Sequence, residues 1–273
     1  MTDRYAVFGN PVAHSKSPYI HSSFARETGQ QLSYEAIEAP VDGFAGAVDA
    51  FRHASGKGIN ITTPFKIDAY EYATDRTERA RLARASNCIK FDGDRAHAEN
   101  FDGVGLVSDI VHNLGVPLAG RHVLMLGAGG AARGALLPFL AQQPAVLTVV
   151  NRDLDKTRAL LRDANAAASV RVANYGDLKG ERFDVVVNAT SASLRGELPP
   201  LPATVFGNDA LAYELVYGKG LTPFLRLAQN AGVRKIADGV GMLVEQAAEA
   251  FQWWRGVRPQ TRATIDALTV PLQ

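Results

Sequence analysis

Hydroxyl, amide and charged side chains gather where short apolar runs end in the first hundred residues. Four groups stand out: Ser15 with Ser17, Asn60 with Thr62 and Lys66, Asn87 alone, and Asn100 with Asp102. Hydroxyls and amides hydrogen-bond the hydroxyls of a ring, and a lysine or a serine pair can hold a carboxylate. A lysine beside a carboxylate can also move a proton while a hydride is transferred. Together these residue types indicate a site for a small polyhydroxylated acid.

Each of these residues also has a purely structural interpretation. Ser17 precedes Pro18, a favoured first residue of a helix, and for this serine alone helix capping is the stronger interpretation. Ser15 can serve its loop, and the three asparagines can be turn residues. Lys66 can be a surface lysine, and Asp102 can be the N-cap of the next helix. Taken singly the structural roles are favoured, whereas the whole set beside a cofactor-binding fold favours a site.

Alternating strand and helix patterns are expected to position these groups. Strands are predicted at 5–9, 32–39 and 59–63, helices at 18–29 and 44–51, a charged helical region at 67–85, and a hairpin pairing 88–91 with 95–99. Repeated strand–helix units predict parallel sheets, which bind ligands at the carboxyl ends of their strands. The polar groups follow three of these predicted strands, so the fold would collect them at one edge.

A second chemical signature lies between His122 and Arg152. A short apolar run ends in Gly127-Ala128-Gly129, a helix-like segment follows, and a β-branched run comes next at 146–150. The spacing Gly127-x-Gly129-x-x-Ala132 fits the dinucleotide fingerprint, in which glycines permit the turn and the approach of a pyrophosphate. The helix N-terminus then holds the phosphates. A merely tight structural turn is the alternative, but both flanking strands and the helix favour dinucleotide binding.

The residues after the second strand of this unit usually select the cofactor. An acidic residue there accepts hydrogen bonds from the ribose hydroxyls of NAD, but this chain has Asn151 and Arg152, with Lys156 one helical turn later. Two cations suit the 2′-phosphate of NADP. Ordinary solvated charges are the alternative, although cations oppose the dipole at a helix start. The neighbouring Asp153 weakens the prediction of strict NADP preference, so NAD stays possible.

Composition limits the classes of protein to consider. The 273 residues suggest one large domain or two ordinary ones, and an apolar share of 47% is ample for a core. A net charge of +1 argues against a nucleic-acid partner. The single cysteine, Cys88, fits a reducing compartment, and no signal peptide or membrane span is recognised. The expectation is a soluble, cytoplasmic α/β protein that binds a small molecule and no membrane.

Several other mechanisms have no signature in the chain. It contains no His-Glu-x-x-His, no cysteine pair, no Gly-x-Ser-x-Gly and no carboxylate cluster, so no metal is expected.

After a helix opened by 102–105, further strands are predicted at 169–173, 183–187 and 211–217, and helices at 222–229, 242–254 and 261–268. The last two helices have no strand partners after them. They are expected to pack back on the first domain, giving domains of 1–103 plus 242–273 and of 104–241.

Over nearly its whole length the chain resembles the shikimate dehydrogenases. The matching stretches are Tyr5 to Pro18, Asn60 to Lys66, Asn100 to Gly105, Gly127 to Arg133, Asn188 to Ser191 and Ala237 to Val244. The resemblance implies an N-terminal α/β substrate domain, a C-terminal Rossmann-type NADP-binding domain, and the reversible reduction of 3-dehydroshikimate to shikimate. It also implies a monomer or homodimer of an aromatic amino acid biosynthesis enzyme.

The resemblance assigns residues to three sites. Lys66 and Asp102 match the catalytic pair, and the substrate site comprises Ser15, Ser17, Thr62, Asn87, Tyr217 and Gln246. The phosphate turn matches Gly127, Gly129, Gly130 and Ala131, and the 2′-phosphate site Asn151, Arg152 and Lys156. The nicotinamide end matches Thr190, Val216 and Gly239.

The chain departs from the family pattern at three positions. Phe101 stands where the family usually has threonine, Ser86 and Cys88 flank Asn87 in place of valine and threonine, and Asp153 replaces a neutral residue. We expect the Phe101 ring to project into the substrate pocket, so that Phe101→Thr raises activity on shikimate. These changes suggest a paralogue that acts on quinate or a related hydroxy acid with NAD(P). A nucleotide-binding regulatory protein without activity is the third hypothesis, which retention of Lys66 and Asp102 opposes.

Overall fold

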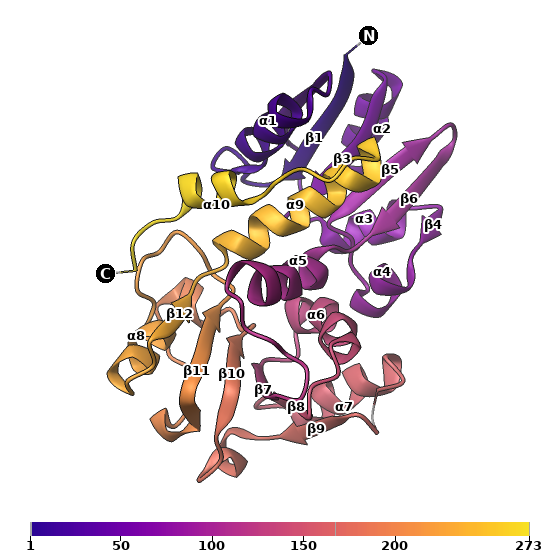
Figure 1. Ribbon diagram of the computed structural model, residues 1–273. Helices are drawn as coiled ribbons and strands as arrows, with labels where there is room; N and C mark the ends of the chain where they lie inside the picture. Colours follow the sequence, from indigo (N-terminus) through magenta and orange to yellow (C-terminus); the bar gives the residue numbers. More distant parts are fainter. Residues whose placement is uncertain (1, 167, 273) are drawn as a thin grey trace. The chain divides into compact units, whose positions relative to one another are not determined.

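The computed structural model describes residues 2–166 and 168–272. The chain divides into two compact units, Met1–Gly105 with Val244–Ala267, and Leu106–Leu243 with Leu268–Gln273. Each unit is built around a six-stranded sheet. Figure 1 labels the elements of both. All three boundaries between the units fall inside helices, namely α5 (Asp102–Ser108), α9 (Val240–Arg255) and α10 (Arg262–Leu268).

The first unit contains a mixed sheet of order β2-β1-β3-β5-β6-β4. Its strands are β1 (Asp3–Gly9), β2 (Leu32–Glu38), β3 (Gly56–Ile61), β4 (Asp75–Arg76), β5 (Cys88–Asp92) and β6 (Arg95–Glu99). Strand β1 pairs in parallel with β2 and β3, whereas β5 pairs antiparallel with both β3 and β6. The predicted hairpin is therefore confirmed, and the expectation of purely parallel sheets is wrong for this unit because the hairpin inserts an antiparallel strand.

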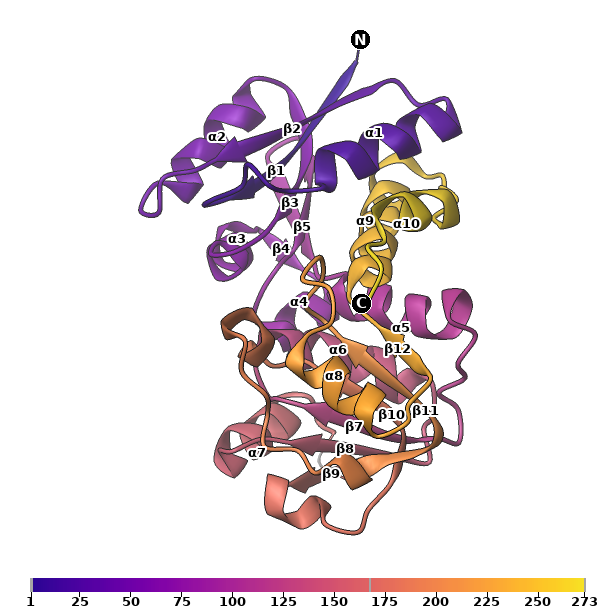
Figure 2. The same cartoon turned by 90° about the vertical axis from the view of Figure 1, so that its left-hand side faces the viewer.

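Alternating side chains of β1 bury opposite faces of this sheet. Ala6 and Phe8 belong to a cluster with α2 (Phe44–His53) and α3 (Lys66–Tyr72), whereas Tyr5 lies in a cluster with Ala250 and Trp254 of α9. Figure 2 shows α2 on one side of these strands and α1 (Ser17–Thr28) on the other. A period of two in side-chain direction explains how one strand supplies both cores.

The second unit contains a wholly parallel sheet of order β12-β11-β10-β7-β8-β9. Its strands are β7 (His122–Leu126), β8 (Val146–Val150), β9 (Val170–Ala173), β10 (Phe183–Asn188), β11 (Phe206–Glu214) and β12 (Lys235–Ala237). Its main helices are α6 (Gly130–Ala141), α7 (Leu154–Asp163) and α8 (Pro223–Asn230). The strand order reverses between β7 and β10, and such a switch point is where doubly wound sheets bind ligands.

The faces of this sheet also divide by alternation. Val123 and Met125 of β7 pack in one cluster with α6 and α7, and Leu124 and Leu126 pack in another with α8. Strands buried on both faces read as continuous apolar runs, which is why the sequence located β7, β8 and β10 closely, whereas the short edge strand β12 was not predicted.

Two predicted elements and one domain boundary differ from the structure. The region 67–85 is not one helix, because Ala73 is extended and α3 gives way to β4 and then to α4 (Glu78–Ala83). Strand β11 begins at Phe206 and ends at Glu214, earlier than predicted. The first domain was predicted to include 242–273, but residues from Leu268 onward belong to the second unit, where Leu272 packs against its core. Met1, Ala167 and Gln273 lie outside the described residues, and so do the domain assignments made for them.

The remaining helices are α10 (Arg262–Leu268), a π-helical turn Asp109–Asn113 after α5, and short 3-10 turns at Tyr175–Leu178, Ala192–Arg195 and Ala203–Val205.

Candidate active site

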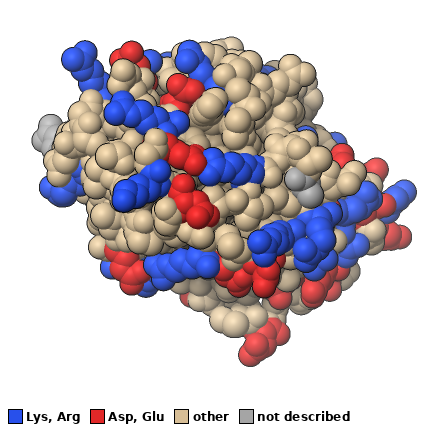
Figure 3. All heavy atoms as spheres, turned by 90° about the horizontal axis from the view of Figure 1, so that it is seen from below, with Lys and Arg blue, Asp and Glu red and all other residues tan. Residues whose placement is uncertain are grey.

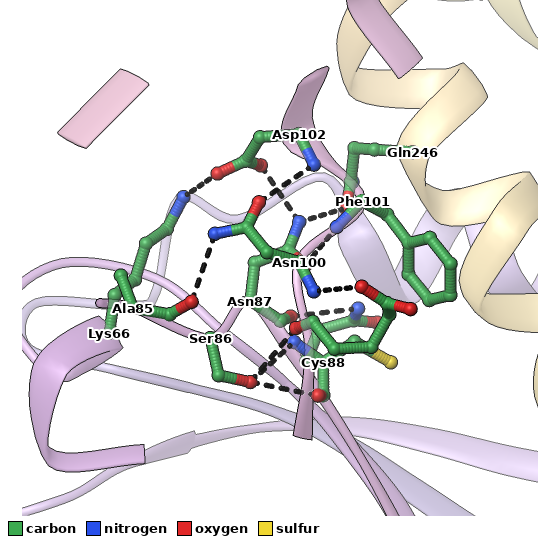
Figure 4. A network of polar contacts seen from close by, with 11 residues as sticks. Lys66, Ala85, Ser86, Asn87, Cys88, Asn100, Phe101, Asp102 and Gln246 are labelled. Carbon is green, nitrogen blue, oxygen red and sulfur yellow. Dashed lines mark hydrogen bonds and ion pairs between the residues drawn. The ribbon is translucent and has the colours of Figure 1, made fainter. Parts of the chain in front are cut away.

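Lys66 and Asp102 form a close ion pair in the first unit. Lys66 begins α3 just after β3, and Asp102 begins α5 just after β6. The Lys66 Nζ lies 2.6 Å from Asp102 Oδ2, and their side chains are 34% and 16% exposed. These exposed fractions leave the pair partly accessible, and Figure 4 shows the Lys66 ammonium and the Asp102 carboxylate pointing toward each other. The structure therefore brings together the two residues that the sequence paired.

Asn87 connects this pair to helix α9. Its Nδ2 donates to Asp102 Oδ1 at 2.7 Å and to Gln246 Oε1 at 3.1 Å, and its Oδ1 accepts the Phe101 N–H at 2.9 Å. Both carboxylate oxygens of Asp102 are thus held, one by an ammonium and one by an amide. Such contacts fix the direction in which Asp102 can accept a further hydrogen bond.

The turn that carries Asp102 is supported by a layer of residues not assigned to the site. Asn100 Oδ1 accepts the Asp102 N–H at 3.1 Å, and Asn60 Nδ2 donates to the Asn87 carbonyl at 3.2 Å. Buried Glu99 accepts the Asn100 N–H at 2.7 Å and pairs with Arg79 at 2.6 Å. Asn60 and Asn100 were visible in the sequence as polar residues at strand ends. Arg79 and Glu99 carried no such signal, because only the fold makes them neighbours.

Ser15 lies in the connection between β1 and α1, Ser17 is the first residue of α1, and Thr62 directly follows β3, the strand that pairs with β1. The predicted capping role of Ser17 is wrong, because Lys16 is the N-cap of α1 and no side chain caps it. Instead, Ser15 Oγ accepts the Ser17 N–H at 3.3 Å, and the Ser17 hydroxyl reaches Tyr34. Tyr34 in turn donates to Asn60 Oδ1 at 2.7 Å. These contacts extend the network from Asn87 to Ser17.

The Phe101 ring does not project into the site as predicted. Phe101 is 4% exposed and packs edge-on against Trp253, with ring centroids 5.7 Å apart. The Arg79 guanidinium lies over the ring at 5.7 Å. Figure 4 shows the ring pointing towards α9, away from the contact between Lys66 and Asp102. Burial of a large aromatic surface in the cluster with Trp254 explains this direction.

In the second unit, the glycine turn after β7 has the geometry of a phosphate-binding turn. Gly127 has φ +106°, and a Cβ there would lie 3.2 Å from the Ala189 carbonyl oxygen. A Cβ on Gly129 or Gly130 would meet nothing within 4 Å, so the turn leaves open space beside its backbone. Gly129 caps α6 with no side-chain hydrogen bond, and Gly130 and Ala131 form its first turn. Backbone N–H groups at a helix start favour an anion.

The turn after β8 presents two exposed cations. Arg152 and Lys156 are exposed, and Asn151 Nδ2 donates to the Asp153 carbonyl at 3.0 Å. The Asp153 carboxylate caps α7 by accepting the Lys156 N–H at 3.0 Å. This cap directs the one acidic side chain of the turn to the helix N-terminus. The structure thus gives Asp153 a local role that its sequence position left open.

The residues matched to the nicotinamide end follow three adjacent strands, β10, β11 and β12. Thr190 donates to Asn188 Oδ1 through its hydroxyl at 2.7 Å and its N–H at 3.1 Å. The Val216 N–H donates to Glu214 Oε1 at 3.3 Å. Gly239 is required by close packing, since a Cβ there would lie 2.2 Å from the Leu215 carbonyl oxygen. Tyr217 is 41% exposed, so its ring is accessible in this unit.

Within the residues that the structure describes, no three His, Cys, Asp or Glu side chains are grouped to hold a metal ion. A parallel sheet with a glycine turn at its switch point, joined to a unit with a lysine–carboxylate pair, defines the class of nucleotide-dependent oxidoreductases. Comparisons with known proteins specify the family within that class.

Three family models match the chain. The shikimate dehydrogenase substrate binding domain matches residues 7–89, the shikimate/quinate 5-dehydrogenase model residues 109–195, and the shikimate 5′-dehydrogenase C-terminal domain residues 239–269. A shikimate dehydrogenase (NADP(+)) of Nitrosospira multiformis is 53% identical over 98% of both chains. The chain belongs to the shikimate dehydrogenase family, which confirms the resemblance found in the sequence.

Solved structures agree with this assignment. The chain is similar to an Ael1 enzyme from Pseudomonas putida, at 60% identity, a TM-score of 0.97 and full coverage of both chains. It is also similar to shikimate 5-dehydrogenase from Thermus thermophilus in complex with NADP(H) and shikimate, at 30% identity, a TM-score of 0.86 and 98% coverage of both. The predicted two-domain α/β fold class is confirmed.

Proposed function

We propose that this chain catalyses the NADP-dependent, reversible reduction of 3-dehydroshikimate to shikimate. Relatives at about half identity over nearly the full length are named shikimate dehydrogenase (NADP(+)). The observation that carries the proposal is the Lys66–Asp102 pair, 2.6 Å apart and still partly exposed. A regulatory protein without activity would have no use for this half-buried pair held by Asn87, which argues against the third hypothesis.

The chain's own residues then manage the proton. NADPH, when bound, supplies a hydride to the carbonyl carbon, and negative charge develops on the carbonyl oxygen. Lys66 donates a hydrogen bond and then a proton to that oxygen. Asp102 orients the Lys66 ammonium and accepts a hydrogen bond from the adjacent substrate hydroxyl. In the oxidation direction, Lys66 takes the proton back.

The remaining residues are assigned to binding. Ser15 and Ser17 hold the substrate carboxylate, Thr62, Asn87 and Gln246 bond its hydroxyls, and Tyr217 contacts it. These roles suit hydroxyl and amide groups, which both donate and accept. Asn87 supports the assignment, because its Oδ1 accepts one hydrogen bond, from the Phe101 N–H, and an amide oxygen has a second lone pair.

The cofactor assignment rests on the second unit. Gly127, Gly129, Gly130 and Ala131 hold the pyrophosphate, Asn151, Arg152 and Lys156 the 2′-phosphate, and Thr190, Val216 and Gly239 the nicotinamide end. The open space beside the Gly129–Gly130 backbone and the two exposed cations after β8 fit this group. We assign residues 104–241 as the dinucleotide-binding domain and the rest of the described chain, up to α10, as the catalytic domain.

We propose a small acid, rather than a nucleic acid or a membrane, as the partner of this chain. On the face drawn in Figure 3, Lys and Arg side chains lie beside Asp and Glu side chains rather than forming one positive surface. Among the described residues, no helix is long and apolar enough to cross a membrane. We propose a cytoplasmic location, in keeping with a biosynthetic role.

Steady-state assays with shikimate and quinate, each against NADP and NAD, test the proposal. Turnover of shikimate with NADP should exceed every other combination by at least about tenfold, a difference of about 1.4 kcal/mol in transition-state binding. Preference for quinate would instead support the paralogue hypothesis, for which the shikimate/quinate family model is the specific support. No turnover with any combination would leave only the regulatory hypothesis.

A further inference from the structure

Glu214 is a buried carboxylate at the end of β11 for which the mechanism above gives no role. It is 0% exposed. Its Oε2 accepts from Asn188 Nδ2 at 3.0 Å, from Ser193 Oγ at 2.5 Å and from Thr222 Oγ1 at 3.1 Å, and its Oε1 accepts the Val216 N–H. Every one of these contacts comes from a donor, as an ionised carboxylate requires.

The donors come from three separate segments of the second unit. Asn188 and Ser193 bracket the loop after β10, Val216 lies in the loop after β11, and Thr222 caps α8. Asn188, which Glu214 holds, in turn holds Thr190, because the Asn188 Oδ1 accepts hydrogen bonds from both the N–H and the hydroxyl of Thr190. The Thr190 methyl in turn lies 3.2 Å from the position that a Cβ on Gly127 would occupy. The Glu214 side chain thus ties the loops after β10 and β11 together, and Thr190 of the first loop lies beside the phosphate turn.

A carboxylate in this place is costly unless its contacts are complete. Burial raises the pKa of Glu214, and the hydrogen bonds from Ser193 and Asn188 oppose that shift. A neutral amide of the same shape would present an N–H₂ group to at least one donor, leaving a buried N–H without an acceptor. The side chain is therefore specific in its charge as well as in its size.

We propose that Glu214 is the positioning residue for the nicotinamide end of the cofactor site. Its carboxylate fixes the position of the Thr190 loop relative to the Val216 backbone, so that both can contact the nicotinamide ring at the same time. This inference rests on the proposed function, because it takes Thr190 and Val216 as nicotinamide contacts. It predicts an effect limited to the nicotinamide end and absent from the adenosine end, whose 2′-phosphate is assigned to the turn after β8.

Calorimetric titration of two ligands separates these ends. NADP carries the nicotinamide, whereas adenosine 2′,5′-bisphosphate carries only the adenosine end. Glu214→Gln should raise the Kd of NADP by about fivefold or more, as expected when contacts to a charged group are lost. It should change the Kd of adenosine 2′,5′-bisphosphate by less than about twofold. Glu181→Gln is the matched control, because Glu181 pairs with Arg171 in the same unit outside this network, and it should change neither constant.

Equal weakening of both ligands would overturn the inference, since it would show a general structural role, and so would unchanged binding of both. Should Glu214→Gln fail to fold, Ser193→Ala removes one donor while keeping the charge. That variant should weaken NADP by about twofold or more and spare the bisphosphate, and equal effects would overturn the inference there too. Binding is measured without turnover, so failure of the wild type to reduce 3-dehydroshikimate would count against the proposed function alone.

Discussion

At the scale of single residues, Lys66 is the proton donor of the proposed reaction. General acid–base assistance typically contributes about 10²–10⁴-fold. Lys66→Ala should therefore lower kcat by at least about a hundredfold, with a much smaller change in NADP affinity. Lys57→Ala is the control, because Lys57 is an exposed lysine on β3. Near-normal turnover of Lys66→Ala in a stopped-flow assay would contradict the mechanism.

Phe101 anchors the Asp102 turn to α9. We therefore expect a small residue at this position to lower both the stability and the activity of the protein. Removing a buried phenyl ring costs about 3–5 kcal/mol when a small residue replaces it. Phe101→Thr should lower the free energy of unfolding by roughly 3 kcal/mol and should lower kcat rather than raise it. Urea denaturation and shikimate turnover check both parts. Phe101→Leu, which keeps most of the apolar volume, should lose less than half as much stability, and a gain of activity in Phe101→Thr would restore the original expectation.

We expect His21 to make folding sensitive to acid. The ring is 0% exposed and stacks on Tyr34 with centroids 4.3 Å apart, and neither ring nitrogen has a hydrogen-bond partner in the described structure. Burial lowers the pKa of His21 from 6.5 to about 3, an effect that the neighbouring Asn60 carboxamide only partly offsets. The unfolded chain binds the proton more readily than the folded chain does. The contribution of neutral His21 to the free energy of unfolding is therefore complete above pH 6.5 and falls as the pH drops towards 3.

Between pH 7 and pH 5 this single group should cost about 2 kcal/mol of unfolding free energy. His21→Phe keeps a ring in the aromatic cluster but has no proton to bind. Chemical denaturation at both pH values gives the unfolding free energy that each protein loses between pH 7 and pH 5. The variant should lose about 2 kcal/mol less than the wild type. Parallel losses in the two proteins would show that His21 is not the acid-sensitive group.

At the scale of elements, the proposed function assigns the choice between NADP and NAD to the turn after β8. Asp153 is occupied as the cap of α7, so Arg152 and Lys156 set the charge of the turn. Arg152→Ala should raise the KM for NADP by about tenfold to a hundredfold, because losing one charge-assisted hydrogen bond weakens binding by about that factor. The KM for NAD should stay nearly unchanged. Arg158→Ala, which removes an exposed arginine paired with Asp155 on the same helix, serves as the control. Equal effects on both cofactors would refute the assignment.

At the scale of the whole molecule, each unit has its own hydrophobic clusters. The clusters around Phe8 and Tyr5 belong to the first unit, and those around Met125 and Leu124 to the second. A ligand at a hundred times its Kd stabilises the form that binds it by about 2.7 kcal/mol. Under those conditions NADP should slow amide hydrogen exchange in β7, β8 and β10 far more than in β1 and β3. Equal slowing in both sheets, measured by mass spectrometry, would show instead that the two units unfold as one.

Much of this protein is determined by local chemistry that the sequence carries by itself. The strand that ends just before Gly127, the helix that begins at Gly130 and the basic turn at Arg152 depend on backbone sterics, dipole and charge within a few residues. The pairing of Lys66 with Asp102 was also foreseeable, because each residue follows a strand of the same sheet. Parallel strands buried on both faces were located for a similar reason, since their apolar runs need no partner to be recognised.

Tertiary structure decided the direction in which several side chains point. Phe101 had a choice between the substrate pocket and the core, and packing against Trp253, far away in the chain, favoured the core. Asn87 meets Gln246 across 159 positions of sequence, and Glu214 collects donors from three segments. A side chain's orientation depends on the sum of burial, hydrogen bonds and charge that its neighbours offer, and those neighbours exist only once distant elements have packed together.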